Sequence, residues 1–153
     1  WVPVEGFALD SYTTAREPDE LLVEVEIAVP GPRERVGYEK FQFHERPSVG
    51  VAVRLTLDEG LTRIDGATVV AGCVTPIPRR LEEAERALSG APLNRIDEAL
   101  KEAAAAASRG VDPVDDLEGS AEYKRHLTGV MLGRAVRQAL GGAPPWGKDG
   151  GSS

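Results

Sequence analysis

Asp112, Asp115 and Asp116 are the side chains whose types and spacing most suggest a metal site. Carboxylate oxygens suit hard cations such as Ca²⁺ and Mg²⁺. The same pattern is typical of a solvated loop before a helix, because negative charge is favourable near a helix N-terminus. We expect the loop, with the hydroxyl of Ser120 as the N-cap of the helix that follows.

The other chemically capable residues do not form a catalytic group. Nucleophilic catalysis needs a Ser or Cys beside an oriented His, and neither His44 nor His126 lies in such a pattern. A zinc site needs about four Cys or His ligands, and no Walker or GxGxxG loop follows a predicted strand. Cys73 lies in an apolar run and is expected to be buried. The residues therefore predict a domain without an active site of its own.

Composition limits the classes of protein to which the chain can belong. Its 153 residues suit one domain, and a net charge of -7 argues against a nucleic acid or an anionic membrane as partner. A single cysteine excludes an internal disulfide and a cysteine-held iron–sulfur cluster on this chain. No apolar run approaches the roughly 20 residues of a membrane span, and no signal-peptide pattern is present. We expect a cytoplasmic protein.

The first half of the chain predicts β-structure. Apolar and polar residues alternate with period two in four segments, at about 20–29, 35–44, 48–58 and 61–74. The alternation slips near Phe41, which predicts a bulge or burial on both faces. Asp65-Gly66 interrupts the last segment in the same manner. The loop 58–60 indicates a hairpin.

The second half predicts helices. After Pro78 the apolar period changes to about 3.6, over 79–89, 94–109 and 120–140. Gly129 and Gly133 would allow another element to pack closely on the last helix. Strands followed by helices cannot form right-handed βαβ units, so the fold class is α+β. We expect a two-layer sandwich, with an antiparallel sheet of three to four strands followed by three helices. Residues 141–153 are rich in Gly, Pro and Ser and are predicted to be disordered.

Four stretches, in order, resemble one family. They read FALDSYTTA with EPDELLVEV at 7–25, YEKF with VGVAV at 38–53, AGCVTPIPR at 71–79, and VDPVDDLEGSAEYKRHL at 111–127. Together they resemble the C-terminal domain of the FAD-binding (medium) subunit of the molybdenum hydroxylases, the carbon monoxide dehydrogenase and xanthine dehydrogenase family. The resemblance implies a lead-in at 1–18 from an FAD-binding domain, and a flavoprotein C-terminal domain at 19–140.

The resemblance also implies a function. In that family the flavin subunit carries electrons from iron–sulfur clusters through FAD to an acceptor. The 2Fe–2S clusters and the molybdenum cofactor lie on partner subunits, and the C-terminal domain covers one side of the isoalloxazine ring. The isolated chain is not expected to be active or to hold FAD, because the Gly-rich loops that bind the pyrophosphate belong to the preceding domain.

Three residues correspond to flavin-proximal positions of the family: Tyr12, Leu22 and Lys40. Each also has a simpler interpretation, as linker packing, core and solvated surface charge respectively. The alternative function is a stand-alone structural or dimerisation module without catalytic activity. The two are distinguished by whether an FAD-binding domain precedes this one in the complete protein.

Overall fold

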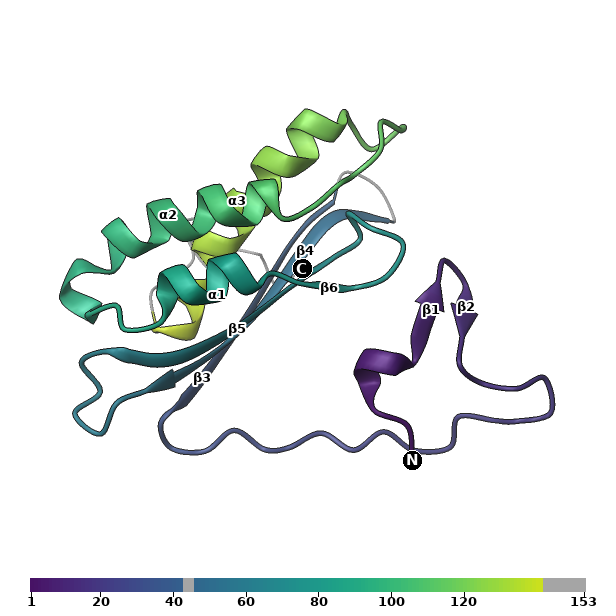
Figure 1. The fold of residues 1–153 in the computed structure, drawn as a ribbon, viewed down its shortest axis with the longest axis horizontal. Helices are drawn as coiled ribbons and strands as arrows, with labels where there is room; N and C mark the ends of the chain where they lie inside the picture. Colours follow the sequence, from purple (N-terminus) through teal and green to yellow (C-terminus); the bar gives the residue numbers. More distant parts are fainter. Residues whose placement is uncertain (43–45, 142–153) are drawn as a thin grey trace, which may run out of the picture.

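The computed structural model describes residues 1–42 and 46–141. The predicted tail therefore lies outside the described residues, except for Gly141, and so does His44. Within the described part, all the strands precede the three α-helices, as the change of period predicts. Figure 1 shows two layers, a sheet and a set of helices on one of its faces. This confirms the α+β sandwich.

The sheet has four antiparallel strands in chain order: β3 (Glu34–Gln42), β4 (Pro47–Leu57), β5 (Ile64–Gly72) and β6 (Arg79–Arg80). The ladder shifts register between Phe41 and Gln42. It shifts again between Thr56 and Leu57, opposite Asp65. The structure thus confirms both predicted irregularities.

Three α-helices of the described residues cover one face of the sheet: α1 (Glu82–Leu88), α2 (Ile96–Arg109) and α3 (Ala121–Ala139). A short 3₁₀ turn, η2 (Leu93–Arg95), precedes α2. Ser120 is the N-cap of α3 as predicted, and its Oγ accepts from the Tyr123 N–H at 3.2 Å. Gly90 ends the α1 region with φ +83°, a left-handed conformation that glycine adopts without a Cβ penalty.

The core lies between the two layers. Alternate side chains of β4 are fully or almost fully buried, and so are the inward residues of α3; they include Val49, Val51, Leu55, Leu132 and Val136. Burial of each such aliphatic side chain contributes about 1.5–3 kcal/mol relative to exposure. The opposite side chains of β4, such as Ala52 and Arg54, remain exposed. The second face of the sheet is therefore open.

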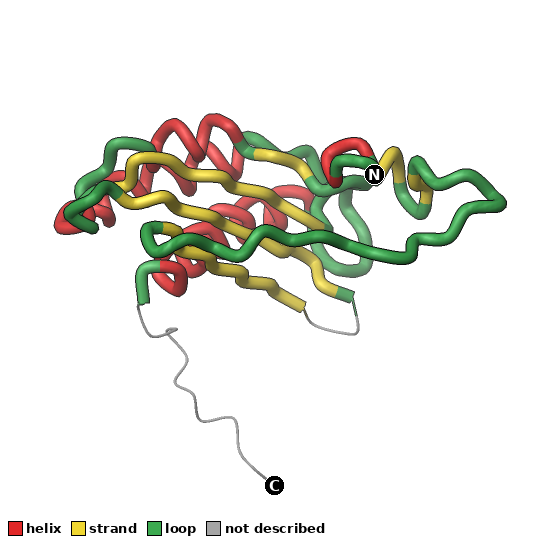
Figure 2. The backbone as a smooth tube through the Cα atoms, turned by 90° about the horizontal axis from the view of Figure 1, so that it is seen from below, coloured by secondary structure: helices red, strands yellow, loops and turns green. Residues whose placement is uncertain are grey.

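The prediction of a strand at about 20–29 is wrong for this chain. The segment has no regular secondary structure, and none of the amides of residues 21–29 makes a hydrogen bond. Figure 2 shows it as a long loop passing along the sheet before it joins β3. The alternation of side chains is real, but a strand also needs a neighbouring strand, and the described residues supply none.

Two smaller predictions are also corrected. Arg79 and Arg80, expected to begin the first helix, form β6 and pair with Ala71 and Val70 of β5, so the helix begins at Glu82. Cys73, expected to be buried, is exposed and has φ +68° in the turn after β5. Its backbone leaves the strand there, so the apolar run continues in sequence but not in the sheet.

The N-terminal residues form a small separate hairpin. A 3₁₀ turn η1 (Val4–Gly6) leads into β1 (Ala8–Asp10), which pairs with β2 (Thr13–Thr14). None of these residues is buried. The hairpin thus adds nothing to the core.

Candidate functional site

The open face of the sheet is the surface on which the predicted site residue Lys40 lies. Lys40 pairs with Gly50 of β4, which pairs with Gly72 of β5, so the next two positions in its row across the sheet are glycines. The Lys40 side chain is exposed. Desolvation raises the pKa of the Cys73 thiol, and the positive charge of Lys40 lowers this pKa by a smaller amount. The positive charge of Lys40 therefore lies beside two positions of the sheet that carry no side chain.

Tyr38 shares this face and was passed over as a site residue by the sequence reasoning. Its side chain is half exposed, at 54%. A Cβ built on Gly50 would lie 2.9 Å from the Tyr38 hydroxyl oxygen, so the ring extends over the glycine. Side chains two positions apart in a strand share a face, and this period places Tyr38 beside Lys40. We define the open face by its central residues: Val36, Tyr38, Lys40, Gly50, Ala52, Val70 and Gly72.

Leu22 lies in the extended segment before β3. Its side chain is 61% exposed, and the flanking Leu21 and Val23 are 84% and 88% exposed. Figure 1 shows this segment on the side of the sheet opposite the helices. Leu22 is therefore not a core residue of this chain, which removes the simpler interpretation given to it.

Tyr12 lies in the turn of the β1–β2 hairpin with φ +57° and is 94% exposed. A left-handed backbone costs about 1–2 kcal/mol at a residue that carries a Cβ. The N–H of Ser11 donates to Oδ1 of Asp10 at 2.7 Å, and the Thr13 hydroxyl donates to the Ser11 carbonyl at 3.3 Å. These bonds hold the turn that presents the Tyr12 ring away from the chain.

The three predicted site residues lie in three different parts of the chain. Tyr12 belongs to the hairpin, Leu22 to the extended segment and Lys40 to the sheet. The segment that contains Leu22 runs along the open side of the sheet, and the β1–β2 hairpin that contains Tyr12 lies apart from the sheet (Figure 1). The assignment of these three residues to one site therefore stays a prediction.

The carboxylates of the acidic loop bind groups at the start of α3. Asp112 accepts from Arg125 at 2.8 Å, and Asp115 accepts from the N–H of Ala121 at 2.5 Å. Asp116 lies 2.6 Å from the buried Nζ of Lys124, whose hydrogen bond lowers the pKa of Asp116. Within the described residues no three His, Cys, Asp or Glu side chains are grouped so as to hold a metal ion. The predicted loop and cap are confirmed.

Comparison with known proteins gives the family. A family model, the CO dehydrogenase flavoprotein C-terminal domain, matches residues 44–139, which is more than half of the chain. The chain belongs to this family. Of the helices that the structure describes, none is long and apolar enough to cross a membrane.

Relatives of this CO dehydrogenase flavoprotein domain carry consistent names. The carbon monoxide dehydrogenase medium chain of Afipia carboxidovorans is 38% identical over 142 residues, with 90% of this chain and 47% of the relative aligned. The xanthine dehydrogenase FAD-binding subunit of Escherichia coli O157:H7 is 29% identical over 149 residues, with 94% and 49% aligned. The chain spans about half the length of the curated relatives it matches.

A solved structure agrees with the sequence relatives. The carbon monoxide dehydrogenase from Hydrogenophaga pseudoflava that lacks the Mo-pyranopterin moiety of its cofactor superimposes with a TM-score of 0.81 at 32% identity. That match covers 92% of this chain and 48% of the other. The family model begins at residue 44, so Tyr12, Leu22 and Lys40 lie outside it.

Proposed function

We propose that this chain is the C-terminal domain of the flavin subunit of a molybdenum-containing hydroxylase or dehydrogenase. Its role is to cover one side of the FAD isoalloxazine and to help electrons pass from iron–sulfur clusters through FAD to an acceptor. The observation that carries the proposal is the exposed apolar segment 20–29 beside an open sheet face, in a chain whose relatives are about twice as long.

The extended segment fits a partner that offers apolar surface and a strand edge. Six aliphatic side chains of this segment are more than 60% exposed: Leu21, Leu22, Val23, Val25, Ile27 and Val29. Such a row with unpaired amides is a template for pairing with another sheet. The partner that we propose is the N-terminal FAD-binding domain. The segment would then be a strand in the complete subunit.

The residues of this chain fit the ring of FAD better than its phosphates. Leu22 and Tyr12 offer apolar and aromatic surface, and Lys40 offers a positive charge. A pyrophosphate needs clustered backbone amides or basic side chains, such as a Gly-rich loop before a helix supplies. The sequence has no such loop after a predicted strand. The preceding domain would hold the phosphates.

In this proposal Leu22 and Lys40 each have a role beside the flavin ring. FAD, when bound, accepts electrons from the clusters and delivers them to the acceptor. Leu22 excludes water from one side of the ring, and Lys40 places positive charge where negative charge increases on reduction. The molybdenum cofactor and the 2Fe–2S clusters would lie on partner subunits, so this domain does not select the substrate.

The test is a redox titration of the complete flavin subunit that carries Leu22→Asp. A carboxylate there opposes the negative charge of the reduced flavin by at least about 1 kcal/mol at 4 Å, even in a medium like water. The flavin midpoint potential should therefore fall. Leu117→Asp is the matched control, because Leu117 is fully exposed in the acidic loop, away from the open face. An unchanged potential in a folded, flavin-loaded Leu22→Asp subunit would remove the domain from the flavin site.

A further inference from the structure

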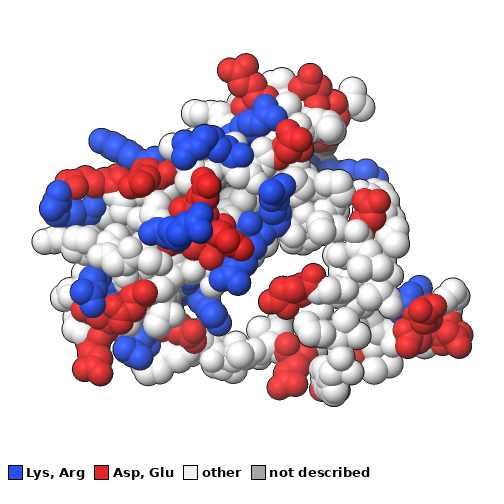
Figure 3. All heavy atoms as spheres, in the orientation of Figure 1, with Lys and Arg blue, Asp and Glu red and all other residues white. Residues whose placement is uncertain are grey.

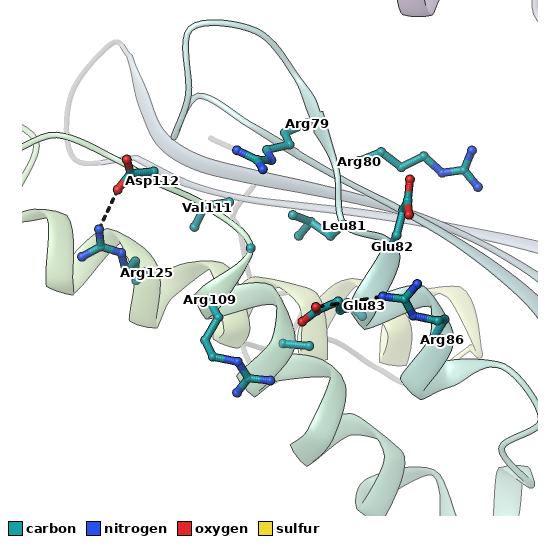
Figure 4. A pocket seen from close by; sticks show the side chains of 13 residues that line it. Arg79, Arg80, Leu81, Glu82, Glu83, Arg86, Arg109, Val111, Asp112 and Arg125 are labelled. Carbon is teal, nitrogen blue, oxygen red and sulfur yellow. Dashed lines mark hydrogen bonds and ion pairs between the residues drawn. The ribbon is translucent and has the colours of Figure 1, made fainter.

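A hollow beside the helical layer carries charges of both signs. It has a volume of about 750 Å³ and lies next to β6, α1 and the end of α2. Figure 4 shows arginines and carboxylates together on its wall, with Arg125 bonded to Asp112 and Arg86 facing Glu83. Figure 3 shows basic and acidic side chains mixed over the helices of this face. The hollow therefore favours neither an anion nor a cation. A more selective arrangement of charge lies at the edge of the sheet.

β3 forms a free edge of the sheet. It is the first strand in the order β3-β4-β5-β6, so only one of its two sides pairs with another strand. The Tyr38 N–H points away from β4 and donates to Oε1 of Gln138. Since backbone groups alternate along a strand, Val36 and Lys40 direct their N–H and C=O groups the same way. Among the described residues the N–H groups of Val36 and Lys40 have no partner. The edge thus offers hydrogen-bond groups to a further strand.

A buried carboxylate beside this edge also lacks a partner. Glu39 is 7% exposed and makes no hydrogen bond or ion pair with any described residue. It lies on the inner face of β3, between Phe41 and Gly37, which packs on α3. No fully buried side-chain oxygen or nitrogen of the described residues lacks a hydrogen bond, so the Glu39 carboxylate reaches the surface. A cation placed there would stabilise it, because an unpaired and largely buried charge is costly.

We propose that the edge of β3 pairs antiparallel with the same edge of a second copy of this chain. The two-fold axis passes through Gly37, so Val36 lies opposite Tyr38 of the second copy. The Val36 N–H then donates to the Tyr38 carbonyl. The Tyr38 N–H exchanges its bond to the exposed Gln138 for one to the Val36 carbonyl. The two sheets join into one, and the pairing does not rest on the proposed flavin role.

The charges of β3 fit this register. Arg35 lies opposite Glu39 of the second copy on the inner face, and Glu34 lies opposite Lys40 on the open face. Arg35 donates only to backbone carbonyls, so among the described residues its guanidinium has no carboxylate partner. It supplies the cation that Glu39 lacks. Glu34 lies 3.7 Å from Arg54 in its own chain, and Lys40 of the second copy adds a further cation beside it.

Neighbouring registers lose these ion pairs. An axis through Tyr38 would place Arg35 opposite Phe41. An axis through Glu39 or through Arg35 would place that charge opposite itself, and like charges directly opposite are destabilising. Of these registers, the axis through Gly37 alone pairs every charged residue of β3 with one of opposite sign.

The helical layer allows the two copies to approach. α3 packs over both β3 and β4, so its axis runs about half a strand spacing inside β3. Adjacent strands lie about 4.8 Å apart, which places the two α3 helices about 10 Å apart across the two-fold axis. Packed helices are separated by about 8–10 Å. The two copies of α3 would therefore contact each other above the joined strands.

Hydrogen exchange of this chain at several concentrations tests the assignment. Sedimentation velocity should show a reversible monomer–dimer equilibrium at micromolar to millimolar concentration. The amides of Val36 and Lys40 should exchange fast in the dilute monomer and at least about tenfold more slowly in the concentrated dimer. The Glu39 amide pairs with β4 in both states and is the internal reference. A chain that stays monomeric, or a dimer whose protection falls on segment 20–29 instead, would overturn the proposal.

Charge reversal and charge exchange identify the register. Arg35→Glu should weaken the dimer about tenfold or more, because the new carboxylate faces Glu39 of the second copy. Arg35→Glu/Glu39→Arg should restore the dimer, since the ion pair forms again with its signs exchanged. Lys101→Glu makes the same charge change at an exposed position of α2 and should leave the dimer unchanged.

A second exchange covers the case in which substitution of the buried Glu39 unfolds the chain. Lys40→Glu should weaken the dimer, and Glu34→Lys/Lys40→Glu should restore it through the pair on the open face, where Lys40 is exposed. Circular dichroism shows whether each variant is folded. Folded double variants that dimerise no better than the single variants would overturn the pairing of β3 edges and leave the proposed flavin role standing.

Discussion

Gly37 in β3 and Ala135 in α3 approach so closely that a Cβ on Gly37 would lie 2.1 Å from the Ala135 carbonyl oxygen. Beside this contact the N–H of Tyr38 donates to Oε1 of Gln138 in α3 at 2.7 Å. β3 thus meets the last helix by backbone contact and by a hydrogen bond across 100 residues of sequence. These contacts with α3 fix the position of β3, the strand whose side chains Tyr38 and Lys40 lie on the open face of the sheet.

Gly37→Ala should therefore destabilise the domain. The methyl group must displace the α3 backbone, and overpacking of this kind costs about 3 kcal/mol. Urea denaturation followed by circular dichroism measures the loss. Gly66→Ala in β5 is the control, because a Cβ there meets nothing within 4 Å. Equal stability of the two variants would contradict the close contact.

The two glycines of α3 should differ, although the sequence suggests the same role for both. A Cβ on Gly129 would lie 2.8 Å from the carbonyl oxygen of Ala104 in α2, whereas a Cβ on Gly133 meets only Arg137 at 3.6 Å. Gly129→Ala is expected to destabilise the domain by about 2 kcal/mol. Gly133→Ala should be neutral or stabilising by up to about 1 kcal/mol, because alanine favours the helix. Thermal unfolding of both variants checks the order, and a destabilised Gly133→Ala would show that α3 packs differently.

The spacing of apolar residues, two in strands and about 3.6 in helices, predicted the fold class and the order of the elements. This spacing is a local property, because it reflects which side of each element is buried. The β4 alternation of Val49, Val51 and Val53 is buried on one side as expected. Turn and cap chemistry is equally local, so Ser120 was predictable as the N-cap. The bulge at Phe41 followed from a slip of phase in the strand itself.

The errors arise where a distant partner decides the structure. Arg80 continues the sheet because the next residue, Leu81, donates its N–H to the Val69 carbonyl at 2.9 Å. The Glu85 carboxylate accepts hydrogen bonds from the Val69 N–H and from the Arg80 side chain. Nothing in the local sequence identifies these partners. The segment 20–29 is the opposite case, in which the pattern indicates a strand whose neighbour the described residues do not contain.

Stability should depend on pH through Asp116. The hydrogen bond from Lys124, and then that from the N–H of Glu118, lower the pKa of this carboxyl group in the folded chain. A lowered folded pKa means that the stabilisation is fully present above the unfolded value of about 3.9. It is lost as the pH falls through the folded value. Asp116→Asn should thus lower the free energy of unfolding at pH 7.

The measurement is urea unfolding of wild type and Asp116→Asn at pH 7 and at pH 3. The difference between them should shrink at pH 3, because the carboxyl group of the unfolded wild type takes up a proton below about 3.9, whereas the lowered pKa of the folded form resists it. Asp19→Asn is the control, since it removes an exposed carboxylate just before segment 20–29, outside the core. A difference that is the same at both pH values would mean that Asp116 acts through its shape and not its charge.

Segment 20–29 should change its hydrogen exchange when the complete flavin subunit is present. Among the described residues the amides of 21–29 have no hydrogen-bond partner, and the aliphatic side chains face solvent, so exchange should occur at close to intrinsic rates. In the complete subunit, a strand that pairs with the FAD-binding domain should have protected amides at every second residue. Exchange mass spectrometry of the two proteins gives the comparison. The amides of β4, such as Val51, are the internal reference and should be protected in both, because β4 is paired on both sides. Fast exchange of segment 20–29 in the complete subunit would show that the segment does not pair with a strand of the FAD-binding domain. The open face of the sheet would then be the surface through which this domain contacts its neighbour.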